Sequence, residues 1–196
     1  EIRILEIAHL GVGHTLAPQG IQYNKDGNLL VANYDNHRIY SFSPDGNYQF
    51  HFGEWGNSPE KLQYPNNIAI DSAGSIYVIE EKNKNIKKFS PEGTYLFQFG
   101  IGELGMIFSL SIDHRDNVWV ADPEHNRIVI FNNKGTEVRS IIGQNQSSDL
   151  NQPVSIYCLP NGAYLVGDRS ESMLKHFDTQ DTLIYKANRA SWGLDE

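Results

Sequence analysis

The sequence has 196 residues, 39% of them hydrophobic, and a formal net charge of −8, and this length suits one large domain with a substantial core. Its single cysteine excludes a disulfide framework, and no run reaches the roughly 18 apolar residues of a membrane span. Since the N-terminus also lacks the charged and then apolar pattern of a signal peptide, the compartment stays open, with an intracellular one favoured.

Along the chain, one pattern of short apolar runs and turns recurs four times. In each copy the third run ends in a phenylalanine, and these residues lie 47, 42 and 46 positions apart: Phe42, Phe89, Phe131 and Phe177. Such a period is typical of propeller blades or of helical solenoids. The runs are rich in β-branched and aromatic residues and are separated by turns such as Asp26-Gly27, which favour hairpins. Each copy therefore predicts a four-stranded antiparallel meander.

The second run of each copy is apolar on both faces, which indicates a strand that is covered on both sides. These runs are 29–32, 76–79, 118–121 and 164–167. Blades stacked around an axis cover one another in this way, whereas a sandwich would leave one face in water. The sequence therefore predicts an all-β fold, a β-propeller of four-stranded antiparallel blades.

We expect a single propeller domain or segment over residues 1–196, with one extra strand at residues 2–10 before the first blade. The predicted parts are an N-terminal strand and loop at 1–17 and blades at 18–63, 64–107, 108–151 and 152–196. Residues 183–189 are expected to supply the fourth strand of the last blade, which leaves the N-terminal strand without a blade.

The second copy shows the repeat pattern most fully. The positions that fit it are Pro65, Ile68, Ala69, Asp71, Gly74, Ile76, Tyr77, Val78, Asn83, Ile86, Phe89, Gly93 and Gly100. Further matches are Asn36-His37-Arg38-Ile39 after Ala32-Asn33 and Asn126-Arg127-Ile128 after Ala121-Asp122. On these residues the chain resembles the NHL-repeat β-propeller family. The resemblance implies rings that mostly have six blades, in proteins that act as RNA readers, protein docks, sensor domains and, in a relative, a metal-dependent lyase.

Four blades leave three arrangements open. The chain can be a segment of a six-bladed ring, a compact four-bladed ring closed by the N-terminal strand, or part of an assembly in which blades are completed between chains. An open ring would expose the apolar flank of a blade and would favour self-association.

Asp122 and Arg127 lie at the two ends of the turn between the second and third strands of the third copy. A carboxylate and a guanidinium at this spacing can pair bidentately and fix the loop, so we expect a structural role rather than ligand binding. The equivalent residues of the other copies do not repeat the pair: they are Asn33 with Arg38, Glu80 with Asn85, and Asp168 with Met173.

No catalytic residue is predicted, because the histidines do not recur at matched positions as a zinc site in a propeller channel would require. Asn66 and Asn67, before the innermost strand of the second copy, can offer amide oxygens to a hard cation such as calcium. The equivalent positions of the other copies supply no carboxylate. We therefore expect no cofactor, and a calcium or zinc ion in the channel is the minor alternative.

The negative charge is spread over all four copies, whereas phosphate binding needs a clustered basic surface. The basic cluster of the sequence adjoins Glu80 and Glu81, and we interpret it as a solvated face. It consists of Lys82, Lys84, Lys87 and Lys88. Nucleic acid is therefore disfavoured as a partner.

The loops on one face of the blades vary most among the copies, and loops on a rigid scaffold often carry function. We expect a non-catalytic binding module that recognises a protein or peptide there, because aromatic side chains often anchor such partners. The candidate residues are Tyr34, His37, Glu54, Trp55, His125 and Asn126. Trp55 can instead pack under its own loop. The alternatives are a divalent-metal-dependent hydrolase or lyase acting on a small molecule and, more weakly, an RNA-binding protein.

Overall fold

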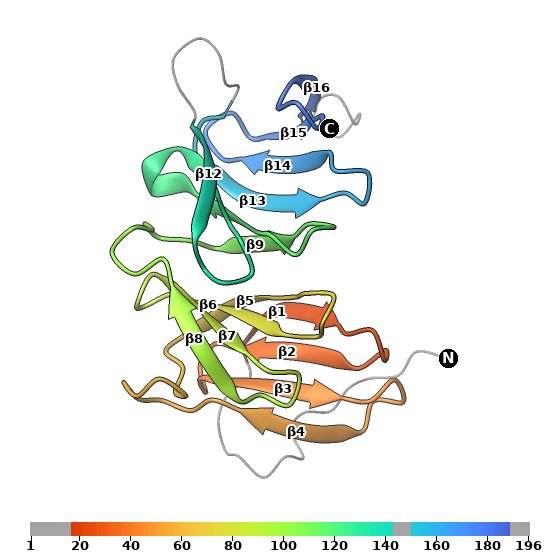
Figure 1. Cartoon of the computed structure of the whole chain (residues 1–196), viewed down its shortest axis with the longest axis vertical. Coiled ribbons are helices and arrows are strands. Elements are labelled where there is room, and N and C mark those ends of the chain that lie inside the picture. The colour runs from red at the N-terminus through yellow and green to blue at the C-terminus, as the bar shows by residue number, and fades with distance from the viewer. Residues whose placement is uncertain (1–16, 143–149, 189–196) are drawn as a thin grey trace, which may run out of the picture. The chain divides into compact units, whose positions relative to one another are not determined.

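The structure is a computed structural model that describes residues 17–142 and 150–188. These residues form four four-stranded antiparallel sheets, in each of which strands adjacent in sequence pair with one another (Figure 1). The predicted all-β fold of four-stranded antiparallel sheets is confirmed. The strand expected at residues 2–10 lies outside the described residues. Within the described ranges there is no helix with the length and hydropathy that a membrane span requires.

We call each sheet a blade. Blade 1 consists of β1 (Pro18–Tyr23), β2 (Leu29–Asn33), β3 (Arg38–Phe42) and β4 (Tyr48–Phe52), and blade 2 of β5 (Pro65–Ile70), β6 (Ile76–Glu80), β7 (Asn85–Phe89) and β8 (Tyr95–Phe99). Blade 3 consists of β9 (Ser109–Ile112), β10 (Val118–Asp122), β11 (Arg127–Phe131) and β12 (Glu137–Ile142), with the short 3-10 helix η2 (Pro123–His125) between β10 and β11. Blade 4 consists of β13 (Pro153–Cys158), β14 (Tyr164–Asp168), β15 (Met173–Phe177) and β16 (Leu183–Ala187).

Tight turns join the first strand of each blade to the second and the third strand to the fourth. A glycine takes a left-handed φ in most of these turns, as Gly27 does at 79°. Two aspartates, Asp116 and Asp181, take this position instead, both with a φ of 61°. A side chain with a Cβ is strained in this region, so each aspartate raises the energy of its turn by about 1 kcal/mol.

The chain divides into two compact units, of which the first ends at Phe99 and the second begins at Gly100. Unit 1 holds blades 1 and 2. Its strand β5 packs against β1 and β2, and the backbones approach so closely that a Cβ on Gly20 would lie 2.8 Å from the carbonyl oxygen of Asn66. The core of unit 1 lies between the two sheets and consists of Leu30, Ala32, Ile39, Leu62, Ile68, Ile76, Val78 and Phe89.

Unit 2 holds blades 3 and 4, and its strand β13 packs against β9 and β10. Its core consists of Trp119, Ala121, Ile128, Ile130, Ile141, Leu150, Ile156, Tyr164, Val166 and Phe177. The second strands, which the sequence predicts to be covered on both faces, are buried along all five residues in β6 and β10 and along four of five in β2, whereas β14 alternates between buried and half-buried residues. Within each unit, therefore, the two sheets pack face to face.

Candidate functional site

The residue that ends the second strand of each blade is a buried polar side chain: Asn33, Glu80, Asp122 and Asp168. Each accepts a hydrogen bond from a backbone N–H in the segment that leads into its own blade. The donors are Ala17 at 3.2 Å, Gln63 at 2.8 Å, Gly105 at 3.2 Å and Asn151 at 2.6 Å. A side chain at the same position of every repeat therefore fixes the loop that leads into each blade.

Asp122 and Arg127, the predicted loop pair, are in contact in blade 3. Arg127 Nε donates to Asp122 Oδ2 at 3.1 Å, while its Nη2 donates to the carbonyl oxygen of Glu103 at 2.6 Å. The pair is thus joined by one hydrogen bond rather than by the two of a bidentate contact, because the second donor binds loop backbone. His125 Nδ1 also lies 2.8 Å from Asp122 Oδ2, so this predicted partner residue belongs to the same loop network.

In blades 2 and 4, a lysine in the middle of the third strand neutralises the charge of the equivalent carboxylate. Lys87 Nζ lies 3.2 Å from Glu80 Oε1, and Lys175 Nζ lies 2.9 Å from Asp168 Oδ2. In sequence each lysine follows its carboxylate by seven positions rather than by the five of the arginine pair. A search at the arginine spacing therefore misses both.

The interpretation of the basic cluster of blade 2 as a solvated face is wrong for two of its lysines. Lys87 and Lys88 are buried, with 3% and 8% of their surface exposed. Lys88 Nζ lies 3.1 Å from Asp71 Oδ2 and 4.7 Å from the centre of the Tyr77 ring. Burial alone would raise the pKa of Asp71, but hydrogen bonds from Ser75 and the contact with Lys88 outweigh it and lower that pKa. These lysines are internal counter-ions.

Four aromatic side chains of unit 1 meet at the loop end of blades 1 and 2. We call Tyr34, His37, Trp55 and Tyr64, together with Lys82, the aromatic rim. The ring centres lie 4.8 Å apart for Tyr34 and Tyr64, 4.7 Å for His37 and Trp55, and 4.8 Å for His37 and Tyr64. Trp55 keeps 50% of its surface exposed, and Lys82 Nζ lies 4.5 Å from the centre of its ring. The rim is thus a preformed cluster with an exposed aromatic face.

Hydrogen bonds to Glu81 help to hold the aromatic rim in place. Tyr34 donates its hydroxyl to Glu81 Oε1 at 3.0 Å, and Asn66 Nδ2 donates to Glu81 Oε2 at 2.9 Å. Burial, together with the bond to Glu81, raises the pKa of Tyr34 to about 12, so the hydroxyl remains a donor at neutral pH. Asn66, one of the two calcium candidates, uses its amide nitrogen here, and Asn67 follows it half-buried on β5. Among residues 17–142 and 150–188, no group of three or more His, Cys, Asp and Glu side chains could hold a metal ion.

Two predicted partner residues connect one blade to the next. His37 and Asn126 occupy the same turn position in blades 1 and 3, with left-handed φ values of 60° and 52°. His37 Nδ1 accepts the backbone N–H of Tyr64 at 3.1 Å, and Asn126 Oδ1 accepts that of Gln152 at 2.9 Å. Both side chains therefore anchor the segment that leads into the following blade.

The link between His37 and Tyr64 is expected to weaken in acid. Burial lowers the pKa of His37 below its ordinary value of 6.5; Asp35 opposes this shift and Lys82 adds to it. Because Nδ1 accepts a hydrogen bond, it must be unprotonated in the folded state. As pH falls below 6.5, the unfolded chain gains a proton that the folded chain resists, so the stability that His37 contributes is full above pH 6.5 and declines towards its lower folded pKa.

Hydrogen exchange measures this decline directly. We expect the protection factor of the Tyr64 amide to fall between about pH 7.5 and about pH 5. His37→Asn should remove the pH dependence while keeping the bond, because Asn126 shows that asparagine suits this turn position. Equal acid sensitivity in both proteins would contradict the assignment to His37.

The remaining predicted residues lie as follows. Glu54 is exposed beside Trp55 and forms an ion pair with Lys61. His125 and Asn126 belong to unit 2, in the turn after β10. Sequence reasoning missed Tyr64 and Lys82 in the rim. Tyr64 could have been found from its position in the sequence. It directly precedes Pro65, which begins the first strand of blade 2, and so it ends one of the loops of the predicted binding face.

Comparisons with known proteins identify the fold. A family model described as a 6-bladed beta-propeller matches residues 16–99, less than half of the chain. Protein brain tumor of Drosophila melanogaster is 38% identical over 58 residues, which make up 30% of this chain and 6% of that protein. A streptogramin B lyase structure gives a TM-score of 0.68 at 17% identity, over 87% of this chain and 54% of that chain. The RRP9 WD40 repeats give 0.72 at 13% identity, over 88% and 52%.

The chain spans about half the length of these two solved structures and a small part of the fly protein. At such low identity the structures show the fold alone, and the predicted β-propeller is confirmed. The finer resemblance to the NHL repeat stays a prediction. Since the similar structures include both a lyase and WD40 repeats, the fold does not determine the function. The function has to be inferred from the side chains of the site.

Proposed function

We propose that this chain is a non-catalytic binding module that recognises a peptide segment of a partner protein through the aromatic rim of unit 1. The observation that carries the proposal is the convergence of four rings from the β2–β3 turn and the β4–β5 connection. Aromatic side chains supply large contact areas at a low entropic cost, which is why they anchor many protein interfaces.

The charges around the rim fit the same role. Asp35, Glu54 and Lys82 are exposed next to the rings, so an aromatic centre is bordered by polar groups of both signs. Protein interfaces commonly have this anatomy. The hydrogen bonds of Tyr34 and His37 fix the rings before any partner arrives, which reduces the ordering that binding requires.

Peptides selected from a random phage-display library against the whole chain test the proposal. Trp55→Ala should weaken binding of the selected peptides by about 30-fold or more, the loss expected for an interface hot spot. The matched control is Tyr23→Ala, which removes another aromatic side chain of unit 1, 63% exposed on β1. This variant should bind the peptides as tightly as the unchanged chain, within about twofold.

Three results would count against the proposal. The first is a selection without enriched peptides, and the second is peptide binding that does not depend on Trp55. The third is tight, stoichiometric binding of calcium or zinc in a calorimetric titration, which would favour the metal-dependent hydrolase or lyase. A steep salt dependence of RNA binding would favour the RNA alternative.

A further inference from the structure

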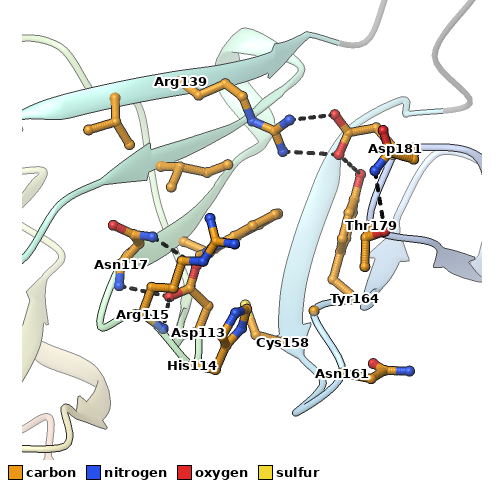
Figure 2. A pocket seen from close by; sticks show the side chains of 15 residues that line it. Asp113, His114, Arg115, Asn117, Arg139, Cys158, Asn161, Tyr164, Thr179 and Asp181 are labelled. Carbon is orange, nitrogen blue, oxygen red and sulfur yellow. Dashed lines mark hydrogen bonds and ion pairs between the residues drawn. The ribbon is translucent and has the colours of Figure 1, made fainter.

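A pocket of about 680 Å³ lies between blades 3 and 4 of unit 2 (Figure 2). It lies where β9 turns into β10 and β15 into β16, at the opposite end of blade 3 from the β10–β11 turn that carries His125. The lining residues from blade 3 are Asp113, His114, Arg115, Asn117, Trp119, Ile130, Val138 and Arg139, and those from blade 4 are Cys158, Asn161, Gly162, Tyr164 and 179–181. Small-molecule sites commonly measure about 300 to 1,000 Å³, so this pocket has room for an organic molecule.

Apolar groups form one wall of the pocket. The ring centres of Trp119 and Tyr164 lie 4.9 Å apart, and Tyr164 stacks on Phe177 with an interplanar angle of 9°. Burial raises the pKa of the Cys158 thiol to about 12, so at neutral pH this residue adds a small uncharged surface. The wall is held in place by core packing and suits the flat apolar part of a ligand.

The two carboxylates that line the pocket are already satisfied by the protein. Asp113 accepts four hydrogen bonds, from the backbone of Arg115 and Asn117 and from the side chains of Asn117 and Trp119. Burial favours its protonated form, but these bonds outweigh burial and lower the pKa of Asp113. Asp181 accepts two bonds from Arg139, at 2.8 and 3.0 Å, and one from the Tyr164 hydroxyl at 3.1 Å.

Three side chains of the pocket keep unused hydrogen-bond donors. In the part of the chain that the structure describes, neither the guanidinium of Arg115 nor the imidazole of His114 has a hydrogen bond or ion pair. Asn161 uses its amide oxygen for the N–H of Ala163 and keeps its NH₂ group available. Figure 2 shows Arg115 and His114 on the blade 3 side of the pocket and Asn161 on the blade 4 side. Surplus donors that include a guanidinium suit an anionic ligand rich in acceptors.

We propose that this pocket binds a small organic monocarboxylate, with the carboxylate on Arg115 and the apolar part against Trp119 and Tyr164. Arginine matches a carboxylate with two parallel hydrogen bonds. This site would be a second binding function, separate from the peptide recognition proposed for unit 1.

The surrounding carboxylates disfavour a ligand that carries the two negative charges of a phosphate ester. Asp113 and Asp181 line the pocket, and Asp116 and Asp178 belong to the turns that border it. A second negative charge on the ligand would be repelled by these four carboxylates, whereas one carboxylate is matched by the guanidinium of Arg115.

Naphthoate and its uncharged amide, naphthamide, are suitable probes. Both are titrated into the whole chain while the indole N–H signal of Trp119, which donates to Asp113 beside the pocket, is followed by NMR. Naphthoate should shift this signal with a Kd of about 1 mM or tighter, the affinity typical of a ligand of this size. Naphthamide should bind at least about tenfold more weakly, because it lacks the charge-assisted contact with arginine.

Two arginine variants locate the contact. Arg115→Gln should weaken naphthoate binding about tenfold or more. Arg169→Gln is the matched control, because Arg169 is exposed in the same unit but lies over the Phe108 ring, in the turn after β14 and outside the pocket lining. This variant should bind naphthoate unchanged.

Several outcomes would overturn the proposal. Equal binding of naphthoate and naphthamide would show that the carboxylate is not recognised. Equal losses of naphthoate binding in the two arginine variants would show that Arg115 does not contact it. Tighter binding of naphthyl phosphate than of naphthoate would reverse the preferred charge. If naphthoate and a second, smaller monocarboxylate, phenylacetate, both leave the Trp119 signal unshifted at millimolar concentration, the pocket does not bind monocarboxylates. None of these results bears on Trp55, so the two binding proposals are tested independently.

Discussion

Replacing Lys175 with methionine is expected to destabilise the chain by about 3 kcal/mol or more. The side chains of Lys175 and Asp168 are both fully buried, and their charged atoms lie 2.9 Å apart. Removing the lysine leaves a buried carboxylate whose remaining neutral partners are the N–H of Asn151 and the hydroxyl of Ser170. Loss of a counter-ion in such a place is costly, because water cannot replace it. Urea denaturation of the whole chain measures the effect.

A matched control and a double variant make this test specific. Lys186→Met changes the exposed lysine that pairs with Lys175 across the β15–β16 ladder, and should alter the free energy of unfolding by no more than about 0.5 kcal/mol. Lys175→Met combined with Asp168→Asn should cost clearly less than the sum of the two single changes, since a neutral pair replaces an ionic one. Additive losses would show that the ion pair is not the source of the effect.

The blades were predictable because their signals are local. A hairpin turn such as Asp26-Gly27 follows from the φ that the turn requires, and it lies within a few residues of the strands that it joins. Burial of β6 and β10 on both faces follows from their continuous apolar composition. Since such signals recur four times, an ambiguous copy is settled by the others.

The charged interior was not predictable in the same way. Lys87 and Lys88 read as surface residues, because lysine is rarely buried without a partner. Their partners, Glu80 and Asp71, are distant enough in sequence that only the register of the sheet brings each pair together. The rim shows the same limit. Tyr34 lies in the β2–β3 turn, whereas Trp55 and Tyr64 lie in the β4–β5 connection, and the contact of Tyr34 with Tyr64 depends on how blade 2 packs on blade 1.

One departure from the repeat, in the turn at Asp181, pointed to the pocket, but the sequence-based predictions did not use it. Asp181 stands where blades 1 to 3 have Gly46, Gly93 and Gly135, and the sequence shows only a degraded turn. In the structure its carboxylate binds Arg139 of blade 3, beside the pocket. A residue that tolerates strain in exchange for a specific contact often marks a functional region. The pocket could therefore have been suspected from this position, although its shape could not.

Phe89→Ala is expected to cost about 3 to 5 kcal/mol, because the side chain is fully buried between the two sheets of unit 1. Phe89 belongs to blade 2, yet its ring centre lies 4.8 Å from that of Phe52 in blade 1 and 5.9 Å from that of Tyr95. The cavity would therefore loosen both blades, and hydrogen-exchange protection should fall in β4 as well as in β7.

Two further variants separate this packing effect from a general sensitivity of blade 2. Phe89→Leu keeps most of the apolar volume and should cost about 1.5 kcal/mol or less. Leu96→Ala shortens a side chain on β8 that is 47% exposed, and should cost less than about 1 kcal/mol. If Phe89→Ala destabilised the chain no more than Leu96→Ala, or if β4 kept its protection, Phe89 would not join the two sheets. Sheet-to-sheet packing would then not be what holds unit 1 together, and the rim above it would lose its rigid support.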